Sequence, residues 1–289
     1  MVMGAGAIGS LFGGYLSNAG NKVTLVGRKK HIQTICKRGL IIRNKAEFTV
    51  KPKAVDSINQ VSGTFDLILI TVKAYDTQQA LLEVNELIND DTTILFLQNG
   101  LGIEETVSKT VETPLRGITM NGSLLLEPGL IIHTGGGDTI IGELDCNITK
   151  RVKMVVDTFS NAGLNTKATK NIRGTVWLKT LINSGINPVG ALTGMKNGEL
   201  IQVPPIRRLI VKTIEEGVKV AEKSAVNLEE DPVTLTMKTA ELTKNNKNSM
   251  LQDVLNNRRT EIDFINGAIS KYGSRSGVLT PINDVLTKQ

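Results

Sequence analysis

The feature that most constrains how this 289-residue chain can fold is the glycine pattern at its start, Gly4-Ala-Gly-Ala-Ile-Gly9. Its spacing, G-x-G-x-x-G, is typical of a strand–turn–helix unit that holds the pyrophosphate of a dinucleotide. In such a turn Gly4 makes the tight bend, Gly6 leaves room for the phosphates, and Gly9 lets helix and strand pack closely. A helical pattern follows, and the next strand is predicted over Lys22–Val26.

This motif alone is a weak signal, and a glycine-rich turn in an unrelated α/β fold is the alternative. Its position before a helix favours the nucleotide site, because free N–H groups at a helix start bind anions. Only Met1-Val-Met precedes the motif, so the first strand is either truncated or unusually short. The predicted phosphate-binding residues are Gly4, Ala5, Gly6, Ala7, Ile8 and Gly9.

The end of the second predicted strand indicates which dinucleotide binds. NAD enzymes place Asp or Glu there to bind the ribose 2′-hydroxyl, whereas this chain has Gly27-Arg-Lys-Lys30. An arginine can pair with the 2′-phosphate of NADP through two hydrogen bonds, and an acid would repel that phosphate. We therefore predict NADPH/NADP+ as the cofactor, with Arg28 as the main contact and Lys29 or Lys30 assisting. A solvated basic turn is the alternative.

Short apolar runs alternate with helical patterns in the first half of the chain and stop after Asn171. This order predicts an α/β fold, with a Rossmann-type parallel sheet in an NADP-binding domain over residues 1–170 and an all-helical substrate and catalytic domain over residues 171–289. We expect extended segments from Pro114 to Gly142 to be edge strands that close the first domain. The other predicted strands are Val2–Met3, Lys22–Val26, Phe48–Val50, Asp66–Val72, Thr93–Leu97 and Leu164–Ala168. The predicted helices are Gly4–Asn18, His31–Arg38, Thr77–Ile88, Ile103–Thr110, Arg151–Asn161, Thr175–Ser184, Pro205–Ser224, Pro232–Leu242 and Met250–Tyr272.

Composition narrows the partners of such a chain. No apolar run approaches the roughly 20 residues that span a bilayer, and the two histidines and two cysteines lack the spacing of a metal site or a disulfide framework. We expect a cytoplasmic protein without a metal or a membrane partner. The net charge of +6 favours small anions as ligands, while an aromatic content of 3% and dispersed basic residues argue against nucleic acid.

Three polar residues interrupt an apolar helical pattern in the second half, at Lys179, Asn183 and Asn187. Their i, i+4, i+8 spacing places them in one stripe along a helix, which indicates a lined cavity. An equal alternative is a lysine that extends to solvent, with Asn187 bonding locally before a helix break at Pro188.

Two later polar residues have ordinary structural explanations. Ser249 and Gln252 match a capping box at the start of a long helix, although a helix start can also receive a substrate carboxylate. Glu261 follows Arg258 by three residues on the same predicted helix, which is the spacing of an i,i+3 ion pair.

With these residues in view, the sequence resembles ketopantoate reductase (2-dehydropantoate 2-reductase) over nearly its whole length. The matching stretches are Gly4-Ala-Gly-Ala-Ile-Gly9, Val72-Lys-Ala74, Gln98-Asn-Gly-Leu-Gly102, Lys179-Thr-Leu-Ile-Asn183, Asn187-Pro188, Asn197-Gly198, Ser249-Met-Leu-Gln-Asp253 and Thr260-Glu-Ile-Asp263. The resemblance implies a helical C-terminal domain similar to that of 6-phosphogluconate dehydrogenase. It also implies reduction of ketopantoate to pantoate with NADPH, in the pathway to pantothenate and coenzyme A.

The resemblance further implies roles for single residues. Lys179 would be the general acid, and Glu261 would bind cofactor or substrate hydroxyls near the reacting centre. Further contacts to NADPH would come from Lys73, Asn99 and Gly122. The substrate would be held by Lys179, Asn183, Asn187, Asn197, Asn246 and Ser249. Gln98 stands where some relatives have His, and Asn248 could take part of the role of Asn246.

Two other functions fit the same architecture. One is a reductase of another small 2-keto or 3-keto acid, because function depends on the site more than on the fold. The other is a non-catalytic NADP(H)-binding sensor, although a sensor needs no acid beside the nicotinamide. A homodimer is an open expectation, since apolar helices such as Ile206–Val220 could pack within one domain or against a second copy.

Overall fold

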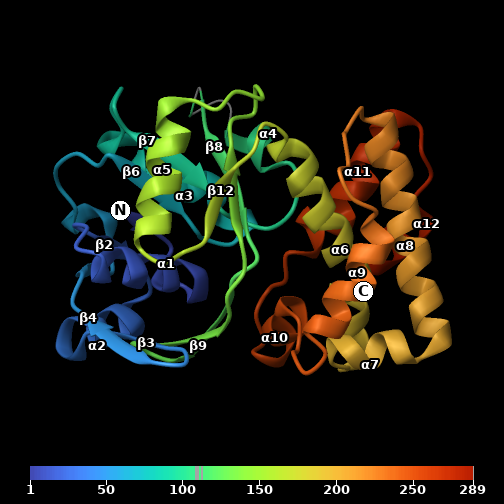
Figure 1. The fold of residues 1–289 in the computed structure, drawn as a ribbon, viewed down its shortest axis with the longest axis horizontal. Coiled ribbons are helices and arrows are strands. Elements are labelled where there is room, and N and C mark those ends of the chain that lie inside the picture. The colour runs from blue at the N-terminus through green and yellow to red at the C-terminus, as the bar shows by residue number, and fades with distance from the viewer. Residues whose placement is uncertain (108–110, 112, 289) are drawn as a thin grey trace. The chain divides into compact units, whose positions relative to one another are not determined.

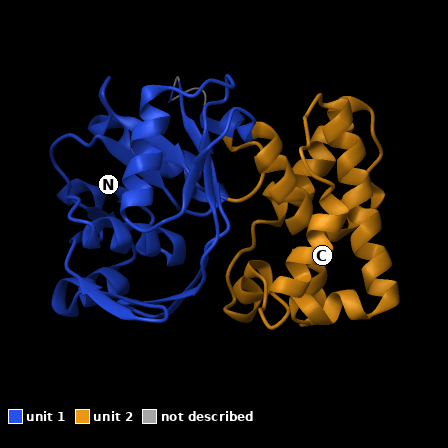
Figure 2. Ribbon diagram, viewed as in Figure 1, with its two compact units in different colours: residues 1–98, 104–172 blue, residues 99–103, 173–289 orange. Residues whose placement is uncertain are grey.

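The glycine turn joins the first strand of a mainly parallel sheet to the first helix of the chain. The structure is a computed structural model that describes residues 1–107, 111 and 113–288. The chain divides into two compact units (Figure 2). Unit 1 comprises Met1–Gln98 and Glu104–Ile172, and unit 2 comprises Asn99–Ile103 and Arg173–Gln289. All the strands belong to unit 1, among the residues described, so the predicted α/β class with a helical C-terminal part is confirmed.

The larger sheet of unit 1 has eight strands in the order β12-β11-β8-β7-β6-β1-β2-β5. Six neighbouring strands, from β8 to β5, run parallel, while β11 is antiparallel to β8. The bounds are β1 Val2–Met3, β2 Thr24–Val26, β5 Lys53–Val55, β6 Leu67–Ile70, β7 Thr93–Phe96, β8 Leu115–Thr119, β11 Thr139–Gly142 and β12 Thr166–Ala168. The short β1 lies between β2 and β6, where the strand order reverses, and ligands of doubly wound sheets bind at the carboxyl ends beside that point.

A smaller sheet has the strand order β4-β3-β10-β9 (Figure 1). Its strands are β3 Leu40–Arg43, β4 Glu47–Val50, β9 Gly122–Glu127 and β10 Leu130–Gly135. The prediction that the whole stretch Pro114–Gly142 consists of edge strands is therefore wrong in part. All five residues of β8 are buried, and this strand lies inside the larger sheet, where apolar side chains on both faces are covered.

The helices of unit 1 cover the larger sheet. They are α1 Ala7–Asn18, α2 Lys29–Arg38, α3 Thr77–Val84, α4 Ile103–Val107 and α5 Lys150–Asn161, with short 3-10 turns η1 Ile58–Gln60, η2 Ala74–Asp76 and η3 Asn85–Leu87. Part of the predicted helix Ile103–Thr110 lies outside the described residues. The rings of Phe12 on α1 and Phe159 on α5 meet edge to face, with centroids 5.2 Å apart, so these two helices share one core on the sheet.

The regular structure of unit 2 consists of helices, with no strand among its described residues (Figure 1). Its helices are α6 Ile172–Thr193, α7 Asn197–Gln202, α8 Pro204–Lys223, α9 Pro232–Leu242, α10 Ser249–Leu255, α11 Asn266–Ser276 and α12 Pro281–Thr287, with the 3-10 turn η4 Ile262–Phe264. The prediction of one long helix over Met250–Tyr272 is wrong. The chain leaves α10 through Asn257, whose φ of 51° is left-handed, and it becomes α-helical again only at Asn266.

The predicted helix Thr175–Ser184 is longer than expected, and the alternative of a helix break at Pro188 is wrong, because α6 runs from Ile172 to Thr193. Proline lacks an N–H group, so the carbonyl of Ser184 loses its intrahelical partner. Asn266, fully buried at the start of α11, donates its side-chain N–H to this carbonyl at 3.1 Å. This side-chain hydrogen bond replaces the one that Pro188 cannot donate, so α6, which carries Lys179, continues past the proline.

Candidate active site

The glycine turn is built as the motif requires. Gly4 has a φ of +105°, and a Cβ there would lie 2.5 Å from the backbone nitrogen of Val72. A Cβ at Gly9 would collide with the carbonyl oxygen of Gly4 and the hydroxyl of Thr71. Thr71 Oγ1 donates to that same carbonyl at 2.9 Å. Two glycines are thus needed for folding, and Thr71, which sequence reasoning missed, fixes the turn to the end of β6.

Gly6 differs from the other two glycines. Its φ of −85° is open to any residue, and a Cβ there would come no closer than 4.0 Å to its nearest neighbour among the described residues, the Gly4 oxygen. Gly6 precedes the first turn of α1, which carries no acidic residue. An empty space before free helix N–H groups fits a bound pyrophosphate. The residues present therefore fit a dinucleotide.

Arg28, Lys29 and Lys30 lie at the start of α2, directly after β2, and all three are exposed. Arg28 is the N-cap residue and the first turn contains no acid. Cations are unfavourable at this end of a helix, whose dipole is already positive there. An anionic ligand would relieve this repulsion.

Lys73 and Gly122 also follow carboxyl ends of parallel strands of the larger sheet. Lys73 is the N-cap residue of η2, after β6, and Gly122 opens β9, three residues after the end of β8. Asn121 holds the chain before Gly122, since its amide donates to Gly137 O at 2.8 Å and its Oδ1 lies 3.0 Å from Nε2 of His133. Burial lowers the pKa of His133, against an opposing hydrogen bond at the Gly135 backbone.

Asn99 follows β7 but belongs to unit 2. In the segment Asn99–Ile103 the backbone N–H of Leu101 donates to the carbonyl oxygen of Phe264 at 2.8 Å. Gly100 has a φ of +92°, and any Cβ there would collide with the same oxygen. Phe264 is three residues from Glu261, whose carbonyl accepts its N–H at 3.0 Å. The segment that carries Asn99 thus packs on the turn that follows Glu261.

The prediction that Glu261 lies on a long helix is wrong. Glu261 directly precedes the 3-10 turn η4. It is 7% exposed. A buried carboxylate outside regular structure is unusual and points to a role at a site.

The stripe Lys179, Asn183 and Asn187 lies on the single helix α6, as the spacing predicts. Lys179 and Asn183 are half-buried and Asn187 is buried, whereas Leu178 and Thr180 beside the lysine are at most 9% exposed. The helix therefore presents three polar groups along one line between apolar neighbours.

Asn248, rather than Ser249, caps α10. Its Oδ1 accepts the N–H of Leu251 at 2.9 Å, and its amide nitrogen lies 3.4 Å from the carbonyl oxygen of Ile186, against Gly190 of α6. The predicted capping box at Ser249 is therefore wrong. Ser249 is the exposed first residue of α10, and its side chain does not cap the helix. The contact of Asn248 with Ile186 holds this end of α10 beside α6, next to Asn187 of the polar stripe.

Asn197 and Asn246 meet through their backbones, since the N–H of Asn197 donates to the carbonyl of Asn246 at 3.0 Å. Asn246 is exposed and Asn197 is 7% exposed. The amide nitrogen of Asn197 donates to Thr243 Oγ1 at 2.9 Å, but its buried Oδ1 has no partner among the described residues. Such an acceptor is costly unless a ligand or water fills it.

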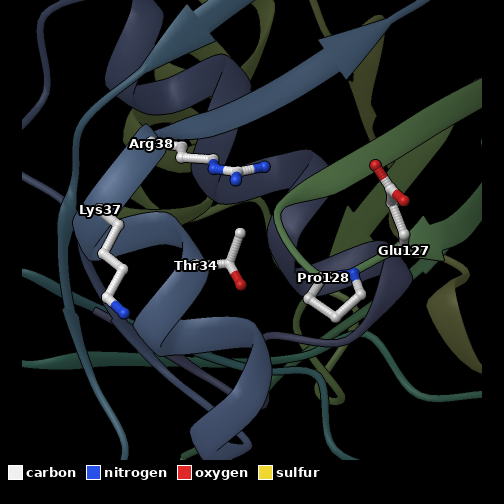
Figure 3. Close-up of a pocket in the computed structure, with 5 residues that line it drawn as sticks. All are labelled: Thr34, Lys37, Arg38, Glu127 and Pro128. Atoms are coloured by element: carbon white, nitrogen blue, oxygen red, sulfur yellow. The ribbon is translucent and has the colours of Figure 1, made fainter.

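A hollow of about 310 Å³ in unit 1 is lined by Thr34, Lys37, Arg38, Glu127 and Pro128 (Figure 3). It lies at the carboxyl end of α2, where helix carbonyls favour cations, and Glu127 adds a negative charge opposite the arginine. None of the predicted site residues lines this hollow. Within the described ranges, no cluster of three His, Cys, Asp or Glu side chains suits a metal ion, and no helix has the length and apolar character to cross a membrane.

Comparison with known proteins decides the family. Residues 1–145 match the family described as "Ketopantoate reductase PanE/ApbA". Residues 171–289 match the family described as "Ketopantoate reductase PanE/ApbA C terminal". The chain belongs to the ketopantoate reductase family. Its members are oxidoreductases with a Rossmann-type unit for a nicotinamide cofactor, as predicted.

Three relatives span almost the whole chain of this family member. The 2-dehydropantoate 2-reductase of Pyrococcus horikoshii is 42% identical over 285 residues, covering 99% of this chain and 94% of the relative. A PanE/ApbA family ketopantoate reductase structure from Ralstonia eutropha is 30% identical with a TM-score of 0.92, over 99% and 95% of the two chains. D-mandelate dehydrogenase, solved with NADH and anilino(oxo)acetate, is 32% identical with a TM-score of 0.92 and the same coverage.

Proposed function

We propose that this chain reduces 2-dehydropantoate to pantoate with NADPH. The observation that carries the proposal is its similarity along the full length to 2-dehydropantoate 2-reductases, at 42% identity for the relative from Pyrococcus horikoshii. The polar stripe of α6 and the open phosphate turn of α1 supply the groups that this reaction needs.

Lys179 is the proposed general acid. When bound, NADPH supplies the hydride that reduces the C2 ketone to an alcohol. Negative charge develops on the ketone oxygen, and a lysine ammonium hydrogen-bonded to it stabilises that charge and delivers the proton. Lys179 then regains a proton from solvent. One keto acid, one NADPH and one proton give one hydroxy acid and one NADP+.

The remaining polar groups of unit 2 bind and orient the substrate. Asn183 and Asn187 follow the lysine along α6 and can hold it and the substrate in line. Ser249 is the exposed first residue of α10, and we assign its hydroxyl to the substrate carboxylate. We assign the remaining contacts to Asn197 and Asn246 for the substrate, Glu261 for cofactor or substrate hydroxyls, and Lys73, Asn99 and Gly122 for the cofactor.

The preference for NADPH over NADH rests on Arg28, with Lys29 or Lys30 assisting. Three cations at a helix start repel each other and the helix dipole, and a 2′-phosphate would pair with them. No carboxylate stands at this position to accept a ribose hydroxyl.

A panel of keto acids tests the substrate. The relation to D-mandelate dehydrogenase makes phenylglyoxylate the informative competitor, because it is the keto acid that corresponds to mandelate. We expect kcat/KM for 2-dehydropantoate with NADPH to exceed that for phenylglyoxylate by at least a hundredfold. A higher value for phenylglyoxylate would replace the proposed substrate, and NADPH binding without turnover on any keto acid would favour a sensor.

A further inference from the structure

Arg116 is a charged residue in the interior of unit 1. It lies on β8 and is 2% exposed, which makes it the largest of the fully buried side chains. Its Nη1 donates to the carbonyls of Phe96 at 3.1 Å and of Gly117 at 3.0 Å, and its Nε donates to Glu104 at 2.7 Å. Burying an arginine costs free energy even when it is paired, so this position calls for a specific explanation.

The partners of Arg116 lie on both sides of one short segment. Nη2 donates to the carbonyl oxygen of Gln98 at 2.8 Å, directly before the segment Asn99–Ile103, and Nε binds the carboxylate of Glu104, directly after it. A planar guanidinium has five N–H groups in a fixed arrangement, so a single side chain holds both ends of the segment at a set distance.

This segment has a demanding conformation. Gly100 and Gly102 have positive φ angles of 92° and 81°, and Leu101 is 3% exposed with its N–H bonded to Phe264. It carries Asn99, the proposed cofactor contact, and packs on the turn that follows Glu261. A segment with two glycines has many unfolded conformations to lose, so fixed ends matter for its placement.

We propose that Arg116 and Glu104 form a clamp that positions the segment Asn99–Ile103 for binding of the nicotinamide cofactor. Arg116 is a positioning residue and touches no reactant. The inference rests on the proposed function only in the role of Asn99, since the clamp itself consists of hydrogen bonds within unit 1.

The test compares three variants of the full chain. Arg116→Lys keeps the charge but loses the forked geometry, and Glu104→Gln, at a side chain that is 26% exposed, weakens the clamp with less risk to folding. The matched control is Arg151→Lys, because Arg151 binds Glu143 (2.8 Å from its Nε) in the same unit, at side-chain exposures of 27% and 6%, away from the segment. Two quantities are measured for each variant: amide hydrogen exchange without ligand and the Kd for NADPH by calorimetry.

We expect exchange at residues 99–103 to rise about tenfold in Arg116→Lys and Glu104→Gln, with Kd for NADPH raised by a similar factor, as one lost charge-assisted hydrogen bond implies. Arg151→Lys leaves both quantities within twofold of the wild type. Equal exchange in all three variants, or an unchanged Kd despite faster exchange, would overturn the clamp. If the wild-type chain binds no NADPH, the proposed function fails, and the exchange measurement alone decides the clamp.

Discussion

Lys179 is the residue on which the proposed chemistry depends, and it lies on α6 next to buried residues in sequence. Trp177 and Thr180 are at most 2% exposed, and the lysine is half-buried. Electrostatic interactions are stronger where water is excluded, so we expect a partly buried ammonium group to stabilise an oxyanion more than a fully exposed one would.

Replacement of this lysine gives the first prediction. We expect Lys179→Ala to bind NADPH with an unchanged Kd and to lose between about 10²- and 10⁴-fold in kcat, because the general acid is absent. Calorimetry and steady-state kinetics measure the two quantities. The control is Lys212→Ala, which removes an exposed lysine of the same unit that pairs with Glu215. Near-wild-type turnover in Lys179→Ala would remove the lysine from the mechanism.

The proposed preference for NADPH over NADH also depends on a single residue, Arg28. We expect Arg28→Ala to raise KM for NADPH by about 10- to 100-fold, since hydrogen bonds to charged groups contribute roughly 1.5–3 kcal/mol, and to leave KM for NADH unchanged. Arg43→Ala is the matched control, because Arg43 is an exposed arginine paired with Glu47 at 2.6 Å. Equal effects on both cofactors would show that Arg28 does not bind the 2′-phosphate.

At the scale of elements, substitutions at two glycines of the first turn test its folding and its cofactor binding separately. We expect Gly9→Ala to destabilise the chain by several kcal/mol, because its Cβ would overlap the Gly4 carbonyl within a packed turn. Gly6→Ala should fold normally, since its Cβ enters open space, but its Kd for NADPH should rise at least tenfold. Thermal unfolding and calorimetry distinguish the two. A Gly6→Ala variant with unchanged affinity would place the phosphates elsewhere.

The elements that periodicity describes well could be predicted, and those decided by single side chains could not. The stripe on α6 and helix α9 follow from spacing alone. The course of α6 through Pro188 depends on Asn266, which is 82 residues from its acceptor Ser184 in sequence, and no local pattern predicts such a partner. The end of α10 had a local signal, since Asn256-Asn257 is a turn-forming pair that the periodicity of Met250–Tyr272 outweighed.

At the scale of the whole molecule, stability should depend on pH through His31. Its Nδ1 accepts the N–H of Gly129 at 3.0 Å and its Nε2 lies 2.9 Å from Ser10 Oγ, so the ring joins α1, α2 and the turn before β10 in its neutral form. Burial lowers the pKa of His31 below its ordinary value of 6.5. The unfolded chain therefore binds more protons than the folded chain in the window below pH 6.5, and folding weakens as pH falls through the folded pKa.

The comparison with His31→Gln isolates this effect from other groups. We expect the wild type to exceed the variant in free energy of unfolding by a constant amount above about pH 7, and the difference to shrink as pH falls below 6.5. Denaturant titrations between pH 7.5 and pH 5 measure it. A difference that stays constant over this range would mean that the buried ring does not titrate as proposed.

Basic residues are concentrated in one stretch near the start of the chain, so the expectation that they are dispersed is wrong there. Between Lys22 and Val55 the chain has ten lysines and arginines and a single acidic residue, Glu47, and all ten cations are exposed. The excess of positive charge in this stretch is larger than the net charge of +6 for the whole chain. It is not obvious from the sequence, because these cations occur singly or in small groups separated mainly by uncharged residues. These cations lie on α2, β3 and β5 and in the turns next to these elements. They include the proposed 2′-phosphate contact, and a positive potential there favours the approach of NADPH.

Much of the candidate site follows from sequence, because the glycine turn and the residues after strand ends occupy fixed positions in a parallel sheet. The supporting contacts do not. Thr71, Asn248 and Arg116 act through hydrogen bonds to backbone groups that are distant in sequence, and their residue types carry no motif.

The proposed reaction is tested most directly by the rate of NADPH oxidation by the purified chain with and without 2-dehydropantoate. We expect oxidation that requires the keto acid, saturates with it, yields one pantoate for each NADPH, and is at least tenfold less efficient with NADH. Oxidation that does not depend on 2-dehydropantoate, or none under conditions where NADPH binds, would contradict the proposed reaction.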